Sequence, residues 1–162
     1  MTDPAPDGAS AQPGTTAQPG PAVALPPGCE LLMEPPDLDS YLRLRREAGL
    51  SPVTAEQGGP ALAHSWAFAH VRRAGEAVAM GRVLGDGGWY FHIADMATLP
   101  AAQRLGLGRA VLGALLDRIA ERAPADPYIT LMADAPGRPL YRSFGFVQTA
   151  PESLGMVLRG RS

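Results

Sequence analysis

The segment from Gln103 to Ala110, with the sequence QRLGLGRA, constrains the fold more than any other part of the chain. It follows a strand-like run that ends at Thr98 and precedes apolar residues at helical spacing. Gly106 and Gly108 stand where the helix would begin, and glycines there let backbone N–H groups and the positive end of the helix dipole approach an anion. The segment therefore predicts a pyrophosphate site inside an α/β domain.

Two common nucleotide-binding motifs are excluded at this position. The P-loop of nucleotide hydrolases needs Lys followed by Ser or Thr after its last glycine, and the chain contains no lysine. The dinucleotide-binding motif, counted from Gly106, needs glycine at its sixth position, which is Val111. The pattern that remains is Q-x-x-G-x-G.

This pattern resembles the acetyl-CoA pyrophosphate loop of the GNAT superfamily of N-acetyltransferases. A second segment, LYRSFGF at residues 140–146, resembles the L-Y-x-x-x-G-F segment near the C-terminus of that family. The resemblance covers roughly residues 29–160. It implies a mixed α/β (α+β) fold, with a mostly antiparallel central sheet flanked by helices and with splayed strands that hold the CoA.

The resemblance also implies a set of residues that bind the cofactor acetyl-CoA. Backbone amides of the loop would contact the pyrophosphate, the Met96 amide would meet the thioester carbonyl, and Thr98 would pair with the pantetheine arm, unless this strand is an ordinary paired one. Asp134 would either bind the pantetheine amide or cap the following short helix. The full set is Met96, Thr98, Gln103, Arg104, Leu105, Gly106, Leu107, Gly108, Arg109 and Asp134; Arg104 departs from the glycine common at its position.

Two residues are candidates for catalysis. Tyr141 matches the family tyrosine that often protonates the departing CoA thiolate, with a packing role as the alternative. His92 falls where some members place a base, and an imidazole suits that task at neutral pH, although a structural histidine is the alternative. His64 and His70 have weaker claims, and three isolated histidines do not predict a metal site.

Strand alternation predicts that Asp95 lies on the face opposite His92 and Met96. Its acid would cap or brace a neighbouring element, with a catalytic role as the alternative. The resemblance implies that acceptor specificity comes from residues 43–63 and from strand residues such as Trp66 and Phe68. The charged residues Arg45, Arg46 and Glu47 are interpreted as a solvated helix face, with binding of a charged substrate as the alternative.

Composition limits the function classes. With 14 arginines against 16 acidic residues, the chain has no global field for nucleic acid or an anionic membrane. Cys29 is the only cysteine, which predicts a reducing compartment, the cytoplasm. We expect an N-acetyltransferase that acts on a primary amine of a small molecule without a metal; a non-catalytic acyl-CoA-binding module, a protein amine as acceptor, and a homodimer remain open.

Residues 1–28, rich in Pro, Gly, Ala, Gln and Thr, predict a disordered extension before a single domain at 29–162. In that domain, periodicity and turn residues predict an α/β order of elements. Strands are expected at 29–33, 65–71, 77–84, 89–98 and 128–133, with the last one buried, and as a closing pair at 146–149 and 156–159. Helices are expected from residue 38 to Gly49, at 54–63 with an interruption at Gly58-Gly59-Pro60, at 110–122 and at 140–144.

Overall fold

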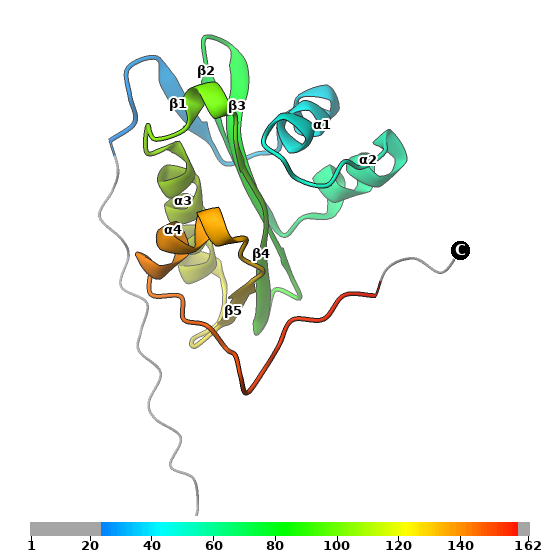
Figure 1. The fold of residues 1–162 in the computed structure, drawn as a ribbon, viewed down its shortest axis with the longest axis vertical. Helices are drawn as coiled ribbons and strands as arrows, with labels where there is room; N and C mark the ends of the chain where they lie inside the picture. Colours follow the sequence, from blue (N-terminus) through cyan, green and yellow to red (C-terminus); the bar gives the residue numbers. More distant parts are fainter. Residues whose placement is uncertain (1–23, 159–162) are drawn as a thin grey trace, which may run out of the picture.

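The computed structural model describes residues 24–158, so most of the predicted N-terminal extension lies outside the described residues. Within them, one mixed sheet separates two pairs of helices: α1 and α2 cover one face, α3 and α4 the other (Figure 1). The elements in chain order are β1 (Cys29–Leu32), α1 (Leu38–Glu47), α2 (Ala55–His64), β2 (Ala67–Arg73), β3 (Glu76–Gly85), β4 (Tyr90–Thr98), α3 (Leu107–Arg122), β5 (Tyr128–Leu131) and α4 (Arg138–Arg142).

The strands follow the sheet in the order β1-β2-β3-β4-β5. The first four are antiparallel neighbours, and β5 pairs with β4 in parallel after the crossover through α3. The predicted meander of three strands is confirmed, and so is the mixed, mostly antiparallel sheet. The order places the loop between β4 and α3 where a parallel crossover begins.

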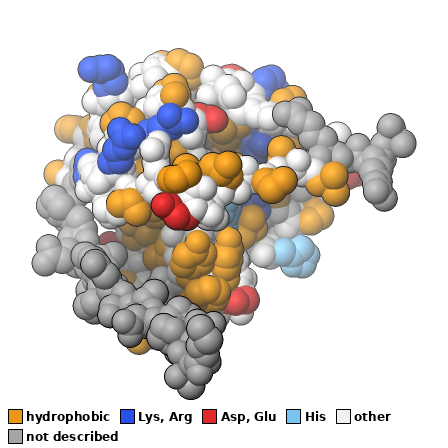
Figure 2. Space-filling view, turned by 60° about the horizontal axis from the view of Figure 1, so that its bottom comes forward, with side chains coloured by type: hydrophobic (Ala, Val, Ile, Leu, Met, Phe, Trp, Pro, Cys, Tyr) orange, Lys and Arg blue, Asp and Glu red, His pale blue; other side chains and the backbone are white. Residues whose placement is uncertain are grey.

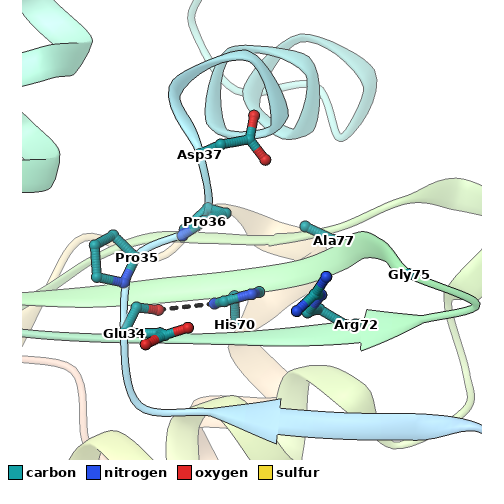
Figure 3. Close-up of a pocket in the computed structure, with 8 residues that line it drawn as sticks. All are labelled: Glu34, Pro35, Pro36, Asp37, His70, Arg72, Gly75 and Ala77. Atoms are coloured by element: carbon teal, nitrogen blue, oxygen red, sulfur yellow. Dashed lines mark hydrogen bonds between the residues drawn. The ribbon is translucent and has the colours of Figure 1, made fainter.

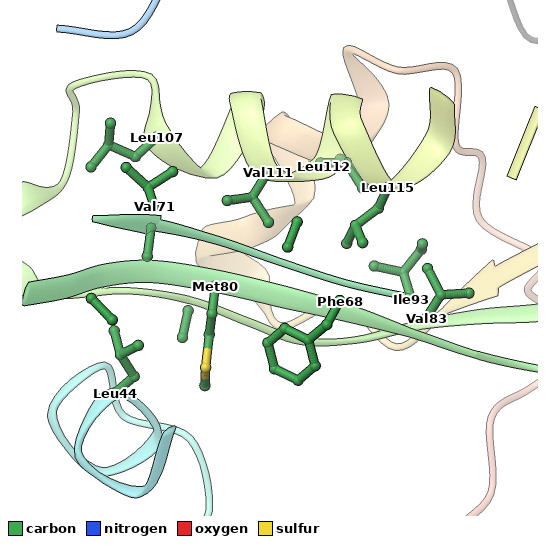
Figure 4. Packing of buried hydrophobic residues seen from close by; sticks show 14 of the residues in the cluster. Leu44, Phe68, Val71, Met80, Val83, Ile93, Leu107, Val111, Leu112 and Leu115 are labelled. Carbon is green, nitrogen blue, oxygen red and sulfur yellow. The ribbon is translucent and has the colours of Figure 1, made fainter. Parts of the chain in front are cut away.

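The core consists of two apolar layers, one on each face of the sheet (Figure 4). On one face, α3 inserts Val111, Leu112 and Leu115, which are fully buried at its apolar spacing. On the other, Leu44 of α1 packs towards Met80. Both layers fix the position of β4, because its residues alternate between them.

The predicted interruption of the second helix is wrong, since α2 runs through Gly58-Gly59-Pro60. A Cβ at Gly58 would lie 2.9 Å from Leu38 and 3.3 Å from Leu42. Gly58 therefore allows α1 and α2 to approach closely instead of ending the helix. A capping box between Thr54 and Gln57 fixes the first turn.

The predicted closing pair of strands is also wrong, because residues 146–149 and 156–158 form no strand. Thr149 and Ser153 instead bond to each other across a local turn. Consequently β5 is an edge strand of the described sheet, and Tyr128 at its start is 42% exposed although we expected a buried strand.

Candidate active site

The glycine loop leads directly into α3. Gly106 is the N-cap residue and adopts φ +80°, a left-handed conformation that favours glycine. A Cβ at Gly108 would meet Thr98 Oγ1 and Leu140 Cδ2 only at 3.6 Å, so the protein does not itself require glycine there. Leu107 is 1% exposed, which leaves only its backbone for a ligand. The first N–H groups of α3 have no carbonyl partner within the helix.

The residues before Gly106 form an exposed turn. Arg104 has φ +63°, in the left-handed region. This conformation costs a non-glycine residue about 1 kcal/mol. The cost explains why the pattern that the loop resembles commonly has glycine where this chain has Arg104. Gln103 donates from Nε2 to the Thr98 carbonyl at 3.3 Å and so connects the turn to the end of β4. Leu105 is 38% exposed. Loop backbone and strand end therefore lie together, as the pyrophosphate prediction requires.

The Arg109 side chain points to α4. Its guanidinium donates to Ser143 Oγ at 2.6 Å and lies 5.0 Å from the centroid of the Phe144 ring. Arg109 thus attaches the segment that carries Tyr141 to the start of α3, while its positive charge stays beside the loop.

The strand β4 extends beyond its parallel partner. Pairing with β5 covers only 90–93 against 128–131, whereas β4 continues to Thr98 and pairs with β3 alone. A bulge interrupts this second part: Met80 faces Ala97 and Arg82 faces Ala94, so two residues of β4 stand opposite Gly81. The Met96 and Thr98 stretch therefore has one edge without a strand neighbour among the described residues.

The bulge overturns part of the predicted facing, because Asp95 lies opposite Met96 as expected but on the same face as His92. Asp95 adopts φ +53°, and its carboxylate lies on the face of α1, the face that His92 shares. Met96 lies on the face of α3, because a Cβ at Gly81 would contact the Met96 sulfur together with Val111. Simple alternation fails because the extra residue resets it.

Asp95 is the centre of a buried polar network. Its carboxylate accepts hydrogen bonds from Tyr41 Oη at 2.7 Å and from Arg82 Nε at 2.6 Å, and it pairs with Arg45 at 2.5 Å. Burial would raise the pKa of Asp95, but the Tyr41 hydrogen bond and the charges of Arg82 and Arg45 outweigh it and lower the pKa. The predicted bracing role is confirmed, whereas a solvated face is wrong for Arg45, which is 8% exposed.

His92 lies half-buried at the paired end of β4. Its Nδ1 is 2.9 Å from Thr130 Oγ1, and that hydroxyl can donate in turn to the Phe91 carbonyl at 3.3 Å. When the Thr130 hydroxyl donates to the Phe91 carbonyl, it accepts from Nδ1–H of His92, and the lone pair is then at Nε2. Burial, and secondarily the charge of Arg82, lowers the pKa of His92, so the ring is neutral at neutral pH.

Tyr141 lies half-buried in α4, edge to face with Phe146. Burial and then the charge of Asp134 raise the pKa of Tyr141, so its hydroxyl keeps its proton at neutral pH. Asp134 precedes a short 3₁₀ turn but caps it with no side-chain hydrogen bond. The capping alternative is therefore wrong, and the exposed carboxylate is available to a ligand.

Two recesses of the surface lie apart from the glycine loop. The first is polar, with Glu34, Asp37 and Arg72 on its wall and the His70 ring fixed by Nδ1 to the Glu34 carbonyl at 2.7 Å (Figure 3). The second lies beside the start of β2, and Trp66 and Phe68 are among its lining residues.

The acceptor-facing role expected of Trp66 and Phe68 stays a prediction, and both side chains also have packing roles. The Trp66 ring packs against Phe91 and under Arg122 of α3, on the face opposite His92. Phe68 is 5% exposed within the core.

Two important residues were missed from the sequence. Arg82, which connects Asp95 to the surroundings of His92, is a charge inside an otherwise apolar strand, and that contrast could have indicated it. Thr130, the hydrogen-bond partner of His92, carries no comparable signal, because only the register between β4 and β5 brings it close.

Comparison with known proteins agrees with this geometry. Residues 61–156 match the family model described as acetyltransferase (GNAT) domain. The chain belongs to the GNAT acetyltransferase family. A protein of unknown function from meticillin-resistant Staphylococcus aureus, described as a probable acetyltransferase, is 32% identical, with 82% of this chain and 99% of that one covered and a TM-score of 0.78.

Two more distant structures share the GNAT fold. A GNAT-family acetyltransferase from Streptococcus pneumoniae is 24% identical over 83% of this chain and 99% of its own, with a TM-score of 0.70. A predicted acetyltransferase from Clostridium acetobutylicum, with acetyl-CoA, is 19% identical over 80% and 96%, with a TM-score of 0.63. A search of curated proteins found no match.

The described part of the chain contains no helix that is both long and apolar enough to span a membrane.

Proposed function

We propose that this GNAT protein transfers the acetyl group of acetyl-CoA to a primary amine of a small molecule, by direct attack in a ternary complex. The observation that carries the proposal is the loop itself: Gly106 in a left-handed conformation, no side chain at Gly108, and helix N–H groups open beside the end of β4. The loop residues 103–109 would hold the pyrophosphate, with Thr98 and Asp134 along the pantetheine arm.

The residues of β4 and α4 supply the proton transfers. The amine nitrogen forms a bond to the acetyl carbon as the bond from carbon to sulfur breaks, and the amine loses a proton while the sulfur gains one. His92, neutral and with its lone pair at Nε2, would accept the first proton, and Tyr141 would donate the second. The Met96 amide would stabilise negative charge on the carbonyl oxygen.

A non-catalytic acyl-CoA-binding module is the main rival. It would keep the loop, yet the neutral His92 and the protonated Tyr141 favour catalysis. A protein amine as acceptor, a homodimer, and a cytoplasmic location, for which the single Cys29 is the argument, remain predictions.

Release of free CoA, followed with a thiol reagent across a panel of amines, tests the proposal. We expect acetyl-CoA turnover that depends on a primary amine, with the acetylated product seen by mass spectrometry. Tight CoA binding without turnover on any amine, including peptide N-termini, would favour the binding module.

A further inference from the structure

Three aromatic side chains form an exposed cluster at the start of β4 and β5. Trp89, Tyr90 and Tyr128 are 59%, 44% and 42% exposed, and we call them the aromatic platform. The rings of Trp89 and Tyr128 are stacked, with centroids 5.1 Å apart and planes 18° apart, and the Tyr90 ring lies 5.4 Å from that of Tyr128. Hydrophobic side chains gather on this end of the molecule (Figure 2). Exposed aromatic surface of this kind is typical of binding sites.

The backbone beneath the platform is fixed. Asp86 Oδ1 accepts hydrogen bonds from three successive N–H groups, those of Gly88 at 2.8 Å, Trp89 at 2.9 Å and Tyr90 at 3.2 Å. These bonds, the one from Gly88 first, lower the pKa of Asp86, so the carboxylate remains charged and accepting. The Tyr128 N–H donates to the Trp89 carbonyl at 2.8 Å and joins the two strands there.

The platform lies next to the proposed base. Tyr90 pairs with Tyr128 and His92 with Thr130, so these side chains share the face opposite α3. Thr130 Oγ1 contacts both His92 Nδ1, at 2.9 Å, and Tyr90 Oη, at 3.4 Å. His92 lies two positions after Tyr90 in the strand, which is roughly 7 Å between their Cα atoms. On β3, Leu84 faces His92 and is 39% exposed, which continues the apolar surface.

The positive charge of Arg82, on the same face of the sheet as His92, disfavours an acceptor that carries a second positive charge. Arg82 lies close enough to lower the pKa of His92, and the Asp95 carboxylate is already shared between two arginines. A polyamine or aminoglycoside would bring further positive charge towards Arg82, whereas a flat neutral group would stack on the platform.

We propose that the aromatic platform is the acceptor-binding subsite and that it takes an aromatic ring joined to the primary amine by a short alkyl chain. This inference rests on the proposed acetyl transfer, because His92 places the amine. His92 and the platform lie on one face of the sheet, so an arylalkylamine can place its amine at His92 and its ring on the platform.

The first test compares primary amines with and without an aromatic ring. We expect kcat/KM for phenethylamine and 3-phenylpropylamine to exceed that for n-butylamine and spermidine by about tenfold or more, since one stacked ring supplies a gain of that order. Acetylation of all four at similar kcat/KM would overturn the subsite and leave the transferase intact.

The second test uses variants. Trp89→Ala and Tyr128→Ala should each lower the ratio of kcat/KM for 3-phenylpropylamine over n-butylamine by about threefold to tenfold, through a higher KM. Met33→Ala removes an apolar side chain of 37% exposure after β1 and should retain the ratio. Calorimetric binding of 3-phenylpropylamine to the CoA complex, weakened in Trp89→Ala, provides a readout that needs no turnover.

These readouts separate the two proposals. Arylalkylamine binding that Trp89→Ala weakens, without turnover, would support the subsite and contradict the transferase. Turnover with an unchanged ratio in both variants would contradict the subsite. A change from dimer to monomer on ultracentrifugation of Trp89→Ala, with the ratio unchanged, would assign the platform to self-association instead.

Discussion

Replacement of Asp95 by asparagine tests the buried network that connects β4 to α1. The carboxylate receives hydrogen bonds from Tyr41 and Arg82 and pairs with Arg45, and the two arginine side chains are only 10% and 14% exposed. Loss of the single negative charge leaves two buried guanidinium groups without a counterion. Breaking a buried pair in this way costs about 3 to 5 kcal/mol of unfolding free energy.

The assay is thermal and urea unfolding of Asp95→Asn beside Asp39→Asn, which changes an exposed carboxylate on α1, the helix that carries Tyr41 and Arg45. We expect Tm of Asp95→Asn to fall by roughly 10 to 15 °C, and that of Asp39→Asn by less than about 2 °C. The folded pKa of Asp95 is lowered, so its stabilisation is present above the unfolded pKa near 4 and is lost as pH falls through the folded pKa. The difference between wild type and Asp95→Asn should therefore shrink below about pH 4. Equal Tm changes for the two variants would refute the reasoning.

Three further changes have definite expectations. His92→Gln should remove from the kcat/KM profile an acid-side inflection that lies below pH 6.5, because burial lowers the pKa of His92 and only the neutral ring accepts a proton; an unchanged profile would make it structural. Tyr141→Phe should lower kcat by roughly 10- to 1000-fold with little change in CoA affinity in titrations, and an unchanged kcat would exclude the hydroxyl as proton donor. Gly106→Ala should lower Tm by about 2 to 6 °C in a thermal scan, because alanine is strained at φ +80°, and an unchanged Tm would show that the turn relaxes.

The sequence predicted the elements whose signals are local. The meander, the helix after the glycine loop and the turn at 86–88 depend on periodicity and turn residues, and they lie within a few residues of their expected limits. The loop between β4 and α3 was predicted because glycines at the start of a helix let backbone N–H groups approach an anion. The family resemblance predicted the fold and the acyl-transfer chemistry.

The remaining features depend on contacts between distant residues. Gly58-Gly59-Pro60 was expected to interrupt a helix, but the close approach of Leu38 explains the glycine at position 58. Asp95 was assigned to the wrong face because a bulge cannot be read from alternation, and only pairing with β3 reveals it. The closing strands carried the right residue types at 146–149 and 156–159, yet residue type alone does not specify a strand partner.

The most direct measurement of the central claim is the affinity of the loop for a pyrophosphate. Calorimetric titration of wild type and Gly108→Val with CoA and with pantetheine, which lacks the pyrophosphate, isolates this contact. The bulk at residue 108 should weaken CoA binding by about tenfold or more, whereas pantetheine binding should change little. Equal loss for both ligands, or an unchanged affinity for CoA in a folded Gly108→Val, would contradict the assignment of the loop between β4 and α3 as the acetyl-CoA site.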